Sequence, residues 1–268
     1  MSGKVDDSSM TFWDHLDELR RVIVRIAVVI VAFMLFSFLF KEQLFDVVLA
    51  PKNSDFCIYQ LFGQLASWLN MPSLRPEVFD AHLINTQLSG QFIMHMTVSF
   101  YAGIILASPY ILYQLFRFVS PALYENEKKY SLHVILWGYV LFIMGVLLSY
   151  FLIFPLTFRF LFLYQVDAMV ENTIMLSSYI DTLSMLSLLM GIVFEIPILC
   201  WLFAKLGFLT PSFMVNYRKH ALVIILIISA VITPTSDIFT LSLVSVPMLL
   251  LYEASIGVVK LTVRKQSY

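Results

Sequence analysis

Three carboxylates occupy positions where a carboxylate can serve a function. Glu18 lies in the motif HLDELRR at residues 15–21, and Glu127 lies in the motif FVSPALYENEKK at residues 118–129. Glu195 is the single charge in a long apolar run. A carboxylate can bind a cation, or it can hold and release a proton. Because the first two adjoin apolar segments and the third lies inside one, all three are candidate functional residues.

Each of these carboxylates also has a structural interpretation. An ionisable residue in the middle of a membrane span costs about 2.5–3.5 kcal/mol on insertion scales, so a functional role for Glu195 is the default. Pro197 leaves the carbonyl of Val193 without its helical hydrogen bond, which predicts a local break. The alternative is a protonated Glu195 that bonds to Ser or Thr of a neighbouring helix. For Glu18 and Glu127, the alternative is a solvated helix end with weak (i, i+4) charge pairs.

The elements that position these carboxylates are membrane helices. Of the 268 residues, 60% are hydrophobic and only 13% are charged. A soluble domain has about half apolar and about a quarter charged residues, and no soluble core could bury so many apolar side chains. The composition therefore excludes a soluble enzyme, a nucleic-acid-binding module and a disordered chain. It predicts an integral membrane protein.

The distribution of charges predicts six membrane-spanning helices. A helix needs about 20 apolar residues to cross the hydrocarbon layer, and four runs with few or no charges supply one span each. The last apolar region is too long for one crossing and contains the turn signal TPTSD at 233–237, which predicts a hairpin of two short spans. We therefore expect one all-α, polytopic membrane domain over residues 1–268, with an external loop at 41–90. The predicted spans are 22–40, 92–115, 131–154, 180–204, 220–234 and 238–256.

Basic residues predict the orientation of these spans. Thirteen of the seventeen Lys and Arg residues fall near the two termini, in the second-to-third connection and in the fourth-to-fifth connection. Because basic residues favour the cytoplasmic side, both termini are expected there. The external loop carries apolar residues at helical spacing, which predicts an amphipathic helix at about 58–69 on the membrane surface or over the bundle.

The sequence contains no motif of a catalytic or metal site. The five histidines are scattered, and Cys57 and Cys200 form no CxxC pair. We therefore expect no enzyme, no cofactor, no metal and no nucleic-acid partner. One alternative function is a proton-coupled secondary transporter with Glu195 as its mid-membrane site, which predicts a second buried charge or an inverted repeat. Another is an intramembrane enzyme, which needs a nucleophile–base pair or metal ligands. The sequence shows none of these features.

Four motifs occur in an order that resembles a known family. They are HLxELR at 15–20, FxxPxLYxxE at 118–127, FExP at 194–197 and ITP at 232–234. Together with the six-span layout, they resemble the TatC subunit of the twin-arginine protein translocase, over about residues 11–260. Each motif alone is only moderately specific, whereas all four in this order are strongly so.

The resemblance implies a receptor for folded cargo proteins that carry a twin-arginine signal peptide. In the family pattern, Glu18 and Glu127 would bind the two arginine side chains, since a carboxylate accepts the planar guanidinium in a bidentate manner. Phe118 would line the adjoining apolar patch. Arg20 and Lys129 would shape the site or balance its charge.

The resemblance also implies residues for transport and assembly. Glu195 would face the concave interior of the bundle, near small single-span partners like TatA and TatB. Pro51, Pro121 and Asp237 fall at positions that the family uses in transport or assembly. The energy would come from the proton motive force, worth about 2.3 kcal/mol per charge per 100 mV.

The resemblance further implies a bacterial cytoplasmic membrane, with an organellar membrane as the alternative, and a homo-oligomer within the receptor complex. The chain departs from the family pattern in two places. Leu241 stands where the family commonly has Gln, so this side chain offers no polar contact there. The first external loop is also longer than the family pattern leads us to expect, and the sequence gives its helix no role.

Overall fold

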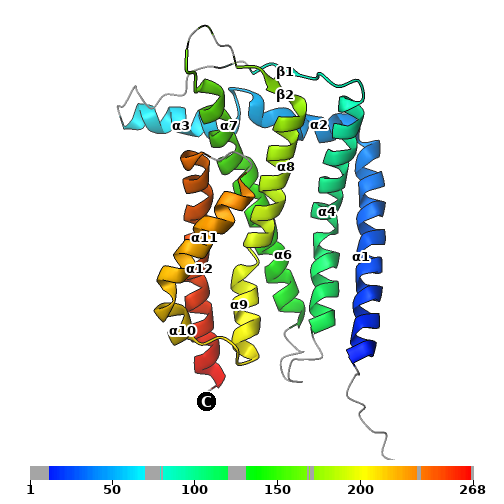
Figure 1. Cartoon of the computed structure of the whole chain (residues 1–268), viewed down its shortest axis with the longest axis vertical. Coiled ribbons are helices and arrows are strands. Elements are labelled where there is room, and N and C mark those ends of the chain that lie inside the picture. Colours follow the sequence, from blue (N-terminus) through cyan, green and yellow to red (C-terminus); the bar gives the residue numbers. More distant parts are fainter. Residues whose placement is uncertain are drawn as a thin grey trace, which may run out of the picture.

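Long helices run side by side through the molecule, and short helices cross over one end of them (Figure 1). The structure, a computed structural model, describes residues 12–69, 79, 81–119, 131–167, 169, 172–233 and 237–266. The helices are α1 (Phe12–Leu39), α2 (Lys41–Leu49), α3 (Cys57–Trp68), α4 (Gly90–Val119), α6 (Ser131–Leu148), α7 (Phe154–Leu163), α8 (Leu176–Val193), α9 (Ile196–Lys205), α10 (Pro211–Asn216), α11 (Arg218–Ile232) and α12 (Ile238–Gln266). Two short strands, β1 (Leu83–Ile84) and β2 (Ile174–Met175), pair in parallel.

The described helices confirm a polytopic, all-α membrane protein. Five helical segments are long and apolar enough to cross a membrane. They are Leu16–Leu39, Gly90–Val119, Leu132–Leu163, Leu176–Lys205 and Ile238–Val263. The helix α11 takes the place of the fifth predicted span. Its 15 residues make it about 22 Å long, which is shorter than a hydrocarbon layer of about 30 Å.

The last helix is longer than the sequence predicts. The sequence predicts a short span that ends at residue 256, but α12 has 29 residues and continues to Gln266. Ile256 and Val259 are buried in a small cluster with Ala204 and Met214, so the apolar face of α12 extends past the predicted end. The helix α12 continues past the predicted end of the span, where it packs against α9 and α10.

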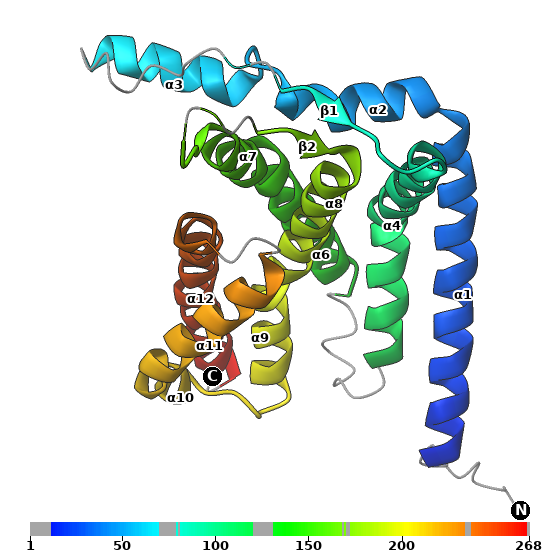
Figure 2. The same ribbon diagram turned by 45° about the horizontal axis from the view of Figure 1, so that its top comes forward.

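The two ends of the bundle differ in what covers them (Figures 1 and 2). At one end lie the start of α1, the end of α12 and the short helix α10. We call this end the terminal face. At the other end lie α2, α3 and both strands, and we call it the distal face. The described ends of the chain therefore share one face.

The helix α1 attaches to the bundle mainly through α4. A side chain at Gly103 of α4 would place its Cβ 2.8 Å from the backbone nitrogen of Met34 and 3.0 Å from the carbonyl oxygen of Ile30. Only glycine therefore allows these two backbones to approach so closely. Other faces of α1 expose large apolar side chains, including Val28 and Leu35, as expected of a helix in lipid.

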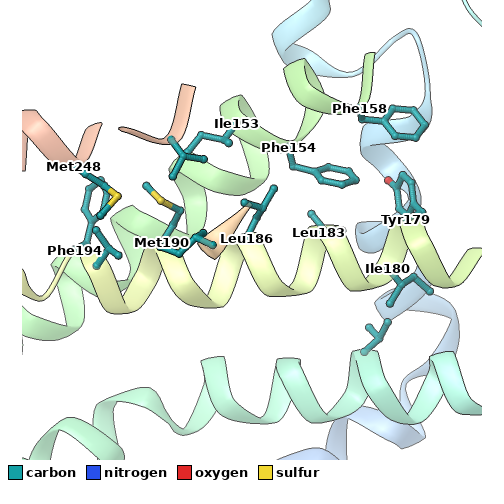
Figure 3. Packing of buried hydrophobic residues seen from close by; sticks show 14 of the residues in the cluster. Ile153, Phe154, Phe158, Tyr179, Ile180, Leu183, Leu186, Met190, Phe194 and Met248 are labelled. Carbon is teal, nitrogen blue, oxygen red and sulfur yellow. The ribbon is translucent and has the colours of Figure 1, made fainter. Parts of the chain in front are cut away.

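The core lies between α8 and the segment that joins α6 to α7 (Figure 3). Phe154 and Phe158 meet the ring of Tyr179 edge-on, at centroid distances of 5.0 and 5.2 Å. A π-helical turn, Ser149–Ile153, links α6 to α7. Pro155 explains this turn, because a proline lacks the amide hydrogen that a regular helix needs at that position.

Tyrosine hydroxyls fasten the distal face to the bundle. Tyr59 of α3 donates to the carbonyl of Pro155 at 2.8 Å. Tyr150 and Tyr179 donate to the carbonyls of Val47 and Val48, at 2.7 and 3.0 Å. These bonds join segments that are far apart in the sequence, and they fix α2 and α3 across the ends of the spans.

The predicted amphipathic helix corresponds to α3. Tyr59 and Ala66 are buried on its inner side, whereas Leu61 and Trp68 are 58% and 82% exposed. Burial raises the pKa of the Tyr59 phenol, and the cationic Arg159 opposes that shift. The Arg159 guanidinium lies over the Tyr59 ring at 5.9 Å from its centroid. One side of α3 is thus anchored, while apolar side chains remain exposed on the other.

Candidate functional site

The terminal face brings two of the predicted receptor residues to one level. The helices α1 and α4 are antiparallel, and Gly103 lies against Ile30 and Met34. Continuing this register toward the terminal face brings Phe118 of α4 level with Glu18 of α1. Both side chains are half-buried. The helix pair therefore places an acidic and an aromatic side chain at the same end.

The carboxylate of Glu18 has no partner within the described part of the chain. The ion pair and the hydrogen bonds of the described residues do not include Glu18. Arg20 follows on the same helix with an exposed side chain, and it likewise enters no ion pair there. A carboxylate without a partner in the described part of the chain can accept hydrogen bonds from a cationic ligand.

Three of the predicted residues cannot be placed. Pro121, Glu127 and Lys129 lie outside the described residues. Their segment starts directly after α4, whose last described turn contains Phe118. The predicted pairing of Glu18 with Glu127 therefore stays a prediction.

Glu195 stands where the fourth long segment is interrupted. The helix α8 ends at Val193, Phe194 and Glu195 form a turn, and α9 starts at Ile196. The break falls where Pro197 removes a helical hydrogen bond. The side chain of Glu195 is half-buried, and its Oε1 has no hydrogen-bond partner among the described residues.

A glycine on α6 makes room for this carboxylate. A Cβ built at Gly138 would lie 3.2 Å from Oε2 of Glu195, so even an alanine would crowd it. The other atoms close to that Cβ are apolar methyl carbons of Leu112 and Ile198, at 3.5 and 3.4 Å. A carboxylate with a buried, unpartnered oxygen in such surroundings can hold a proton or meet a polar group of a partner.

A cavity of about 700 Å³ lies close to Glu195, toward the terminal face. It is formed by α6, α9 and α12, and Pro197 and Ile198 are part of its wall. Trp137 and Trp201 give it an aromatic lining, and Lys205 lies toward its terminal end. This combination of rings, aliphatic side chains and a cation suits an apolar ligand segment that ends at the membrane boundary.

Pro51 and Asp237 lie in other places and have structural contacts of their own. Pro51 is buried in the 3-10 turn Ala50–Lys52, and its carbonyl accepts a hydrogen bond from the Tyr59 hydroxyl at 3.3 Å. Asp237 precedes α12, and its Oδ1 accepts a hydrogen bond from the backbone nitrogen of Thr240 at 2.7 Å. The Asp237 side chain thus caps α12.

The structure therefore separates the predicted residues that it describes into four places. Glu18, Arg20 and Phe118 lie at the terminal face, Glu195 lies within the bundle, and Pro51 and Asp237 stabilise local turns. Sequence reasoning missed Gly138 and the two tryptophans of the cavity. Their only sequence signal is a glycine next to Trp137 in an apolar run, which is too common to identify a site. Within the described residues, no group of three His, Cys, Asp or Glu side chains could hold a metal ion.

Comparisons with known proteins agree with this layout. A family model described as "Sec-independent protein translocase protein (TatC)" matches residues 14–247. TatC of Blattabacterium is 34% identical over 257 residues, which cover 94% of this chain and 96% of that protein. TatC of Aquifex aeolicus is 33% identical over 261 residues, covering 96% and 98%. A crystal structure of the twin-arginine translocase receptor TatC superimposes with a TM-score of 0.73 at 31% identity, covering 93% of this chain and 99% of that one.

Proposed function

The chain belongs to the TatC family of Sec-independent protein translocase subunits, and we propose that its terminal face binds twin-arginine signal peptides. It is a multi-pass protein of the bacterial inner membrane and a component of protein transport. The observation that carries the proposal is the Glu18 carboxylate, which has no hydrogen-bond or ion-pair partner among the described residues and lies level with Phe118 at the terminal end of the α1–α4 pair.

Recognition of two arginines requires two acceptors that match a planar guanidinium. A carboxylate offers two oxygens in one plane and accepts two parallel hydrogen bonds from arginine, which lysine cannot supply. Glu18 is one such acceptor, and Glu127 is the second in this proposal. Phe118 receives the apolar part of the peptide. Arg20 and Lys129 balance the local charge and disfavour peptides with extra cations.

The terminal face must then lie in the cytoplasm, where signal peptides are first exposed. Both described ends of the chain lie on that face, and the predicted spans assign thirteen of the seventeen Lys and Arg residues to the side of the two termini. Basic residues favour the cytoplasmic side. This orientation is part of the proposal.

We infer a transport role for Glu195 and the cavity formed by α6, α9 and α12. Small single-span subunits of the TatA and TatB type pack against the apolar faces near this carboxylate, and further copies of this chain join the receptor complex. Folded cargo crosses in the resulting assembly, driven by the proton motive force. A mid-membrane carboxylate suits this role because it can exchange a proton or bind a polar group of a partner helix.

Photo-crosslinking of a labelled twin-arginine signal peptide to membrane vesicles tests the receptor role. The variants are Glu18→Ala and Glu127→Ala, and the matched control is Glu42→Ala, which removes an exposed carboxylate from α2 on the distal face. We expect both test variants to crosslink much less peptide than the wild type and the control to crosslink as much. Undiminished crosslinking by both test variants contradicts the proposed site.

A further inference from the structure

The helix α3 has two apolar surfaces, and the bundle covers only one of them. Tyr59 and Ala66 are buried against other elements, whereas Leu61, Leu65 and Trp68 are exposed. The three exposed side chains are spaced at i, i+4 and i+7, so they form a single stripe along the helix. We call this stripe the outer flank of α3. The sequence leaves two positions open for this helix, on the membrane or over the bundle, and the buried face accounts only for the second.

The polar side chains of α3 lie on a third side of the helix. Gln60, Gln64 and Ser67 repeat at the same spacing, one position before the residues of the outer flank. They therefore lie about 100° around the helix from that flank. In the other direction, Ile58 and Phe62 lie between the outer flank and the buried face. The apolar surface of α3 thus runs without interruption from the bundle to the outer flank.

The helix α3 is uncharged. None of its twelve residues is acidic or basic. A helix that faces water normally carries charged or polar side chains over its whole outward side. The outer flank ends at Trp68, and tryptophan is enriched where the hydrocarbon layer meets the lipid headgroups. The composition therefore fits a helix that meets lipid with its outer flank.

The hydrogen bond of Tyr59 sets the depth of α3 relative to the membrane. The Tyr59 hydroxyl donates to the carbonyl of Pro155, which lies eight residues before the end of the apolar helical segment Leu132–Leu163. At 1.5 Å per residue, Pro155 is about 12 Å from the distal end of this segment. The segment has 32 residues and is about 48 Å long, so it extends about 9 Å beyond each side of a hydrocarbon layer of about 30 Å. Pro155, and α3 with it, therefore lies near the boundary of the hydrocarbon layer.

The helix α3 also reaches beyond the bundle at this level. In both views, its far end lies outside the outline of the other helices (Figures 1 and 2). The helix α7, to which Tyr59 bonds, exposes the apolar side chains of Phe160 and Leu163. In a membrane protein such exposed apolar side chains face lipid. The outer flank therefore continues the lipid-facing surface of the bundle.

We propose that the outer flank of α3 is inserted into the leaflet on the distal side, at the boundary between acyl chains and headgroups. Leu61 and Leu65 contact acyl chains, and the indole N–H of Trp68 donates to a headgroup oxygen. Gln64, on the polar side, faces the water. A protein partner is not needed to cover this flank, because lipid surrounds the bundle at this level. Since Tyr59 bonds α3 to α7, the inserted helix also fixes the depth of the bundle in the membrane.

Spin labels on two sides of α3 test this proposal in proteoliposomes of the full-length chain. Cys57→Ser and Cys200→Ser remove the native thiols, and the label is attached to Leu65→Cys on the outer flank or to Gln64→Cys on the polar side. Both positions are exposed, so the label leaves the core intact. Collisions are measured with oxygen, which dissolves in the hydrocarbon layer, and with a nickel chelate, which stays in water. We expect the nickel chelate to reach the Leu65→Cys label several-fold less often than the Gln64→Cys label, and oxygen to reach it more often.

Two results of the same measurement would overturn the proposal. Equal collision of the nickel chelate with both labels would mean that the outer flank faces water. Protection of the Leu65→Cys label from both reagents would mean that a protein, such as a second copy of this chain, covers the flank. Leu61→Cys and Gln60→Cys repeat the comparison one turn earlier in the helix, so a local disturbance by one label does not decide the result.

Discussion

The distal face of this bundle and the α1 end of its terminal face differ in how their polar side chains are bonded. On the distal face, the hydroxyls of Tyr59, Tyr150 and Tyr179 donate to backbone carbonyls of other elements, and stacked and edge-on rings fill the space between them. On the terminal face, Glu18 and Arg20 enter no such bonds within the described residues. The terminal face has such a bond between α12 and α10, where the Tyr252 hydroxyl donates to the carbonyl of Met214, but Glu18 and Arg20 at the α1 end of that face have none among the described residues.

This difference indicates that the distal face supports the bundle and the terminal face binds the ligand. A subunit that must hold short helices across the ends of several spans needs a rigid distal face, because a binding constellation is only as precise as its support. A receptor face needs groups whose hydrogen bonds are left for the ligand.

Truncation of the Tyr59 ring should destabilise the protein most. Tyr59 is 2% exposed, packs edge-on against Phe79 and donates to the carbonyl of Pro155. We expect Tyr59→Ala to lower the free energy of unfolding by about 3–5 kcal/mol. Unfolding in detergent, followed by tryptophan fluorescence, measures the change. The control Tyr164→Ala removes a ring that is 65% exposed. Equal stability of the two variants would show that the contacts of Tyr59 on the distal face do not stabilise the protein.

Replacement of Glu195 should slow transport of cargo without impairing insertion of the protein into the membrane. Glu195→Leu removes an insertion cost of about 2.5–3.5 kcal/mol, so the variant should insert normally. We expect it to export folded cargo several-fold more slowly, because neither the charge nor the hydrogen-bonding oxygens remain. Export by intact cells measures the effect, and Glu195→Gln separates charge from hydrogen bonding. Wild-type export by Glu195→Leu would mean that the residue is only structural.

The close approach of α1 and α4 should be required for peptide binding. Gly103→Leu places a side chain against the backbone of Met34, at a cost of about 1–3 kcal/mol, and it should push α1 and Glu18 away from α4. We expect weaker binding of a twin-arginine peptide. Gly257→Leu is the matched control, because a Cβ at Gly257 meets no atom within 4 Å. Equal binding by the two variants would show that this register does not matter.

The exposed ion pair on the α11–α12 hairpin should matter least. Arg218 and Glu253 approach to 2.7 Å, but their side chains are 50% and 52% exposed. We expect Arg218→Ala to change the free energy of unfolding by about 0.2–1 kcal/mol, and less at high salt. Chemical denaturation at two salt concentrations measures the effect. If Arg218→Ala lowered the free energy of unfolding as much as Tyr59→Ala does, exposed ion pairs would stabilise the protein as strongly as the buried contacts of the distal face.

The sequence predicts the polytopic, all-α membrane fold well, for a physical reason. An uncharged run of about 20 residues has few alternatives to a membrane helix, and the break at Glu195 follows from Pro197 alone. The family also follows from the order of four short motifs. These features are local, so they can be read along the chain.

What the sequence could not predict depends on contacts between distant segments. Tyr59 and Pro155 are far apart in the chain, and nothing in the sequence indicates that a hydroxyl of one meets the carbonyl of the other. Asp237 fits a transport residue in the family pattern, yet its local contact is a helix cap. The length of α12 also depends on packing against α9 and α10, since the charge of Lys260 suggests an earlier end to the span.

We propose that the terminal face recognises arginine through Glu18, whose carboxylate has no partner within the part of the chain that the structure describes. The most direct test is the Kd of a labelled signal peptide, with either two arginines or two lysines, for wild-type protein, Glu18→Gln and Glu42→Gln. The wild type and Glu42→Gln should bind the arginine peptide more tightly than the lysine peptide. Glu18→Gln should bind the arginine peptide at least about tenfold more weakly and lose the preference. An unchanged Kd and an unchanged preference in Glu18→Gln would contradict the claim.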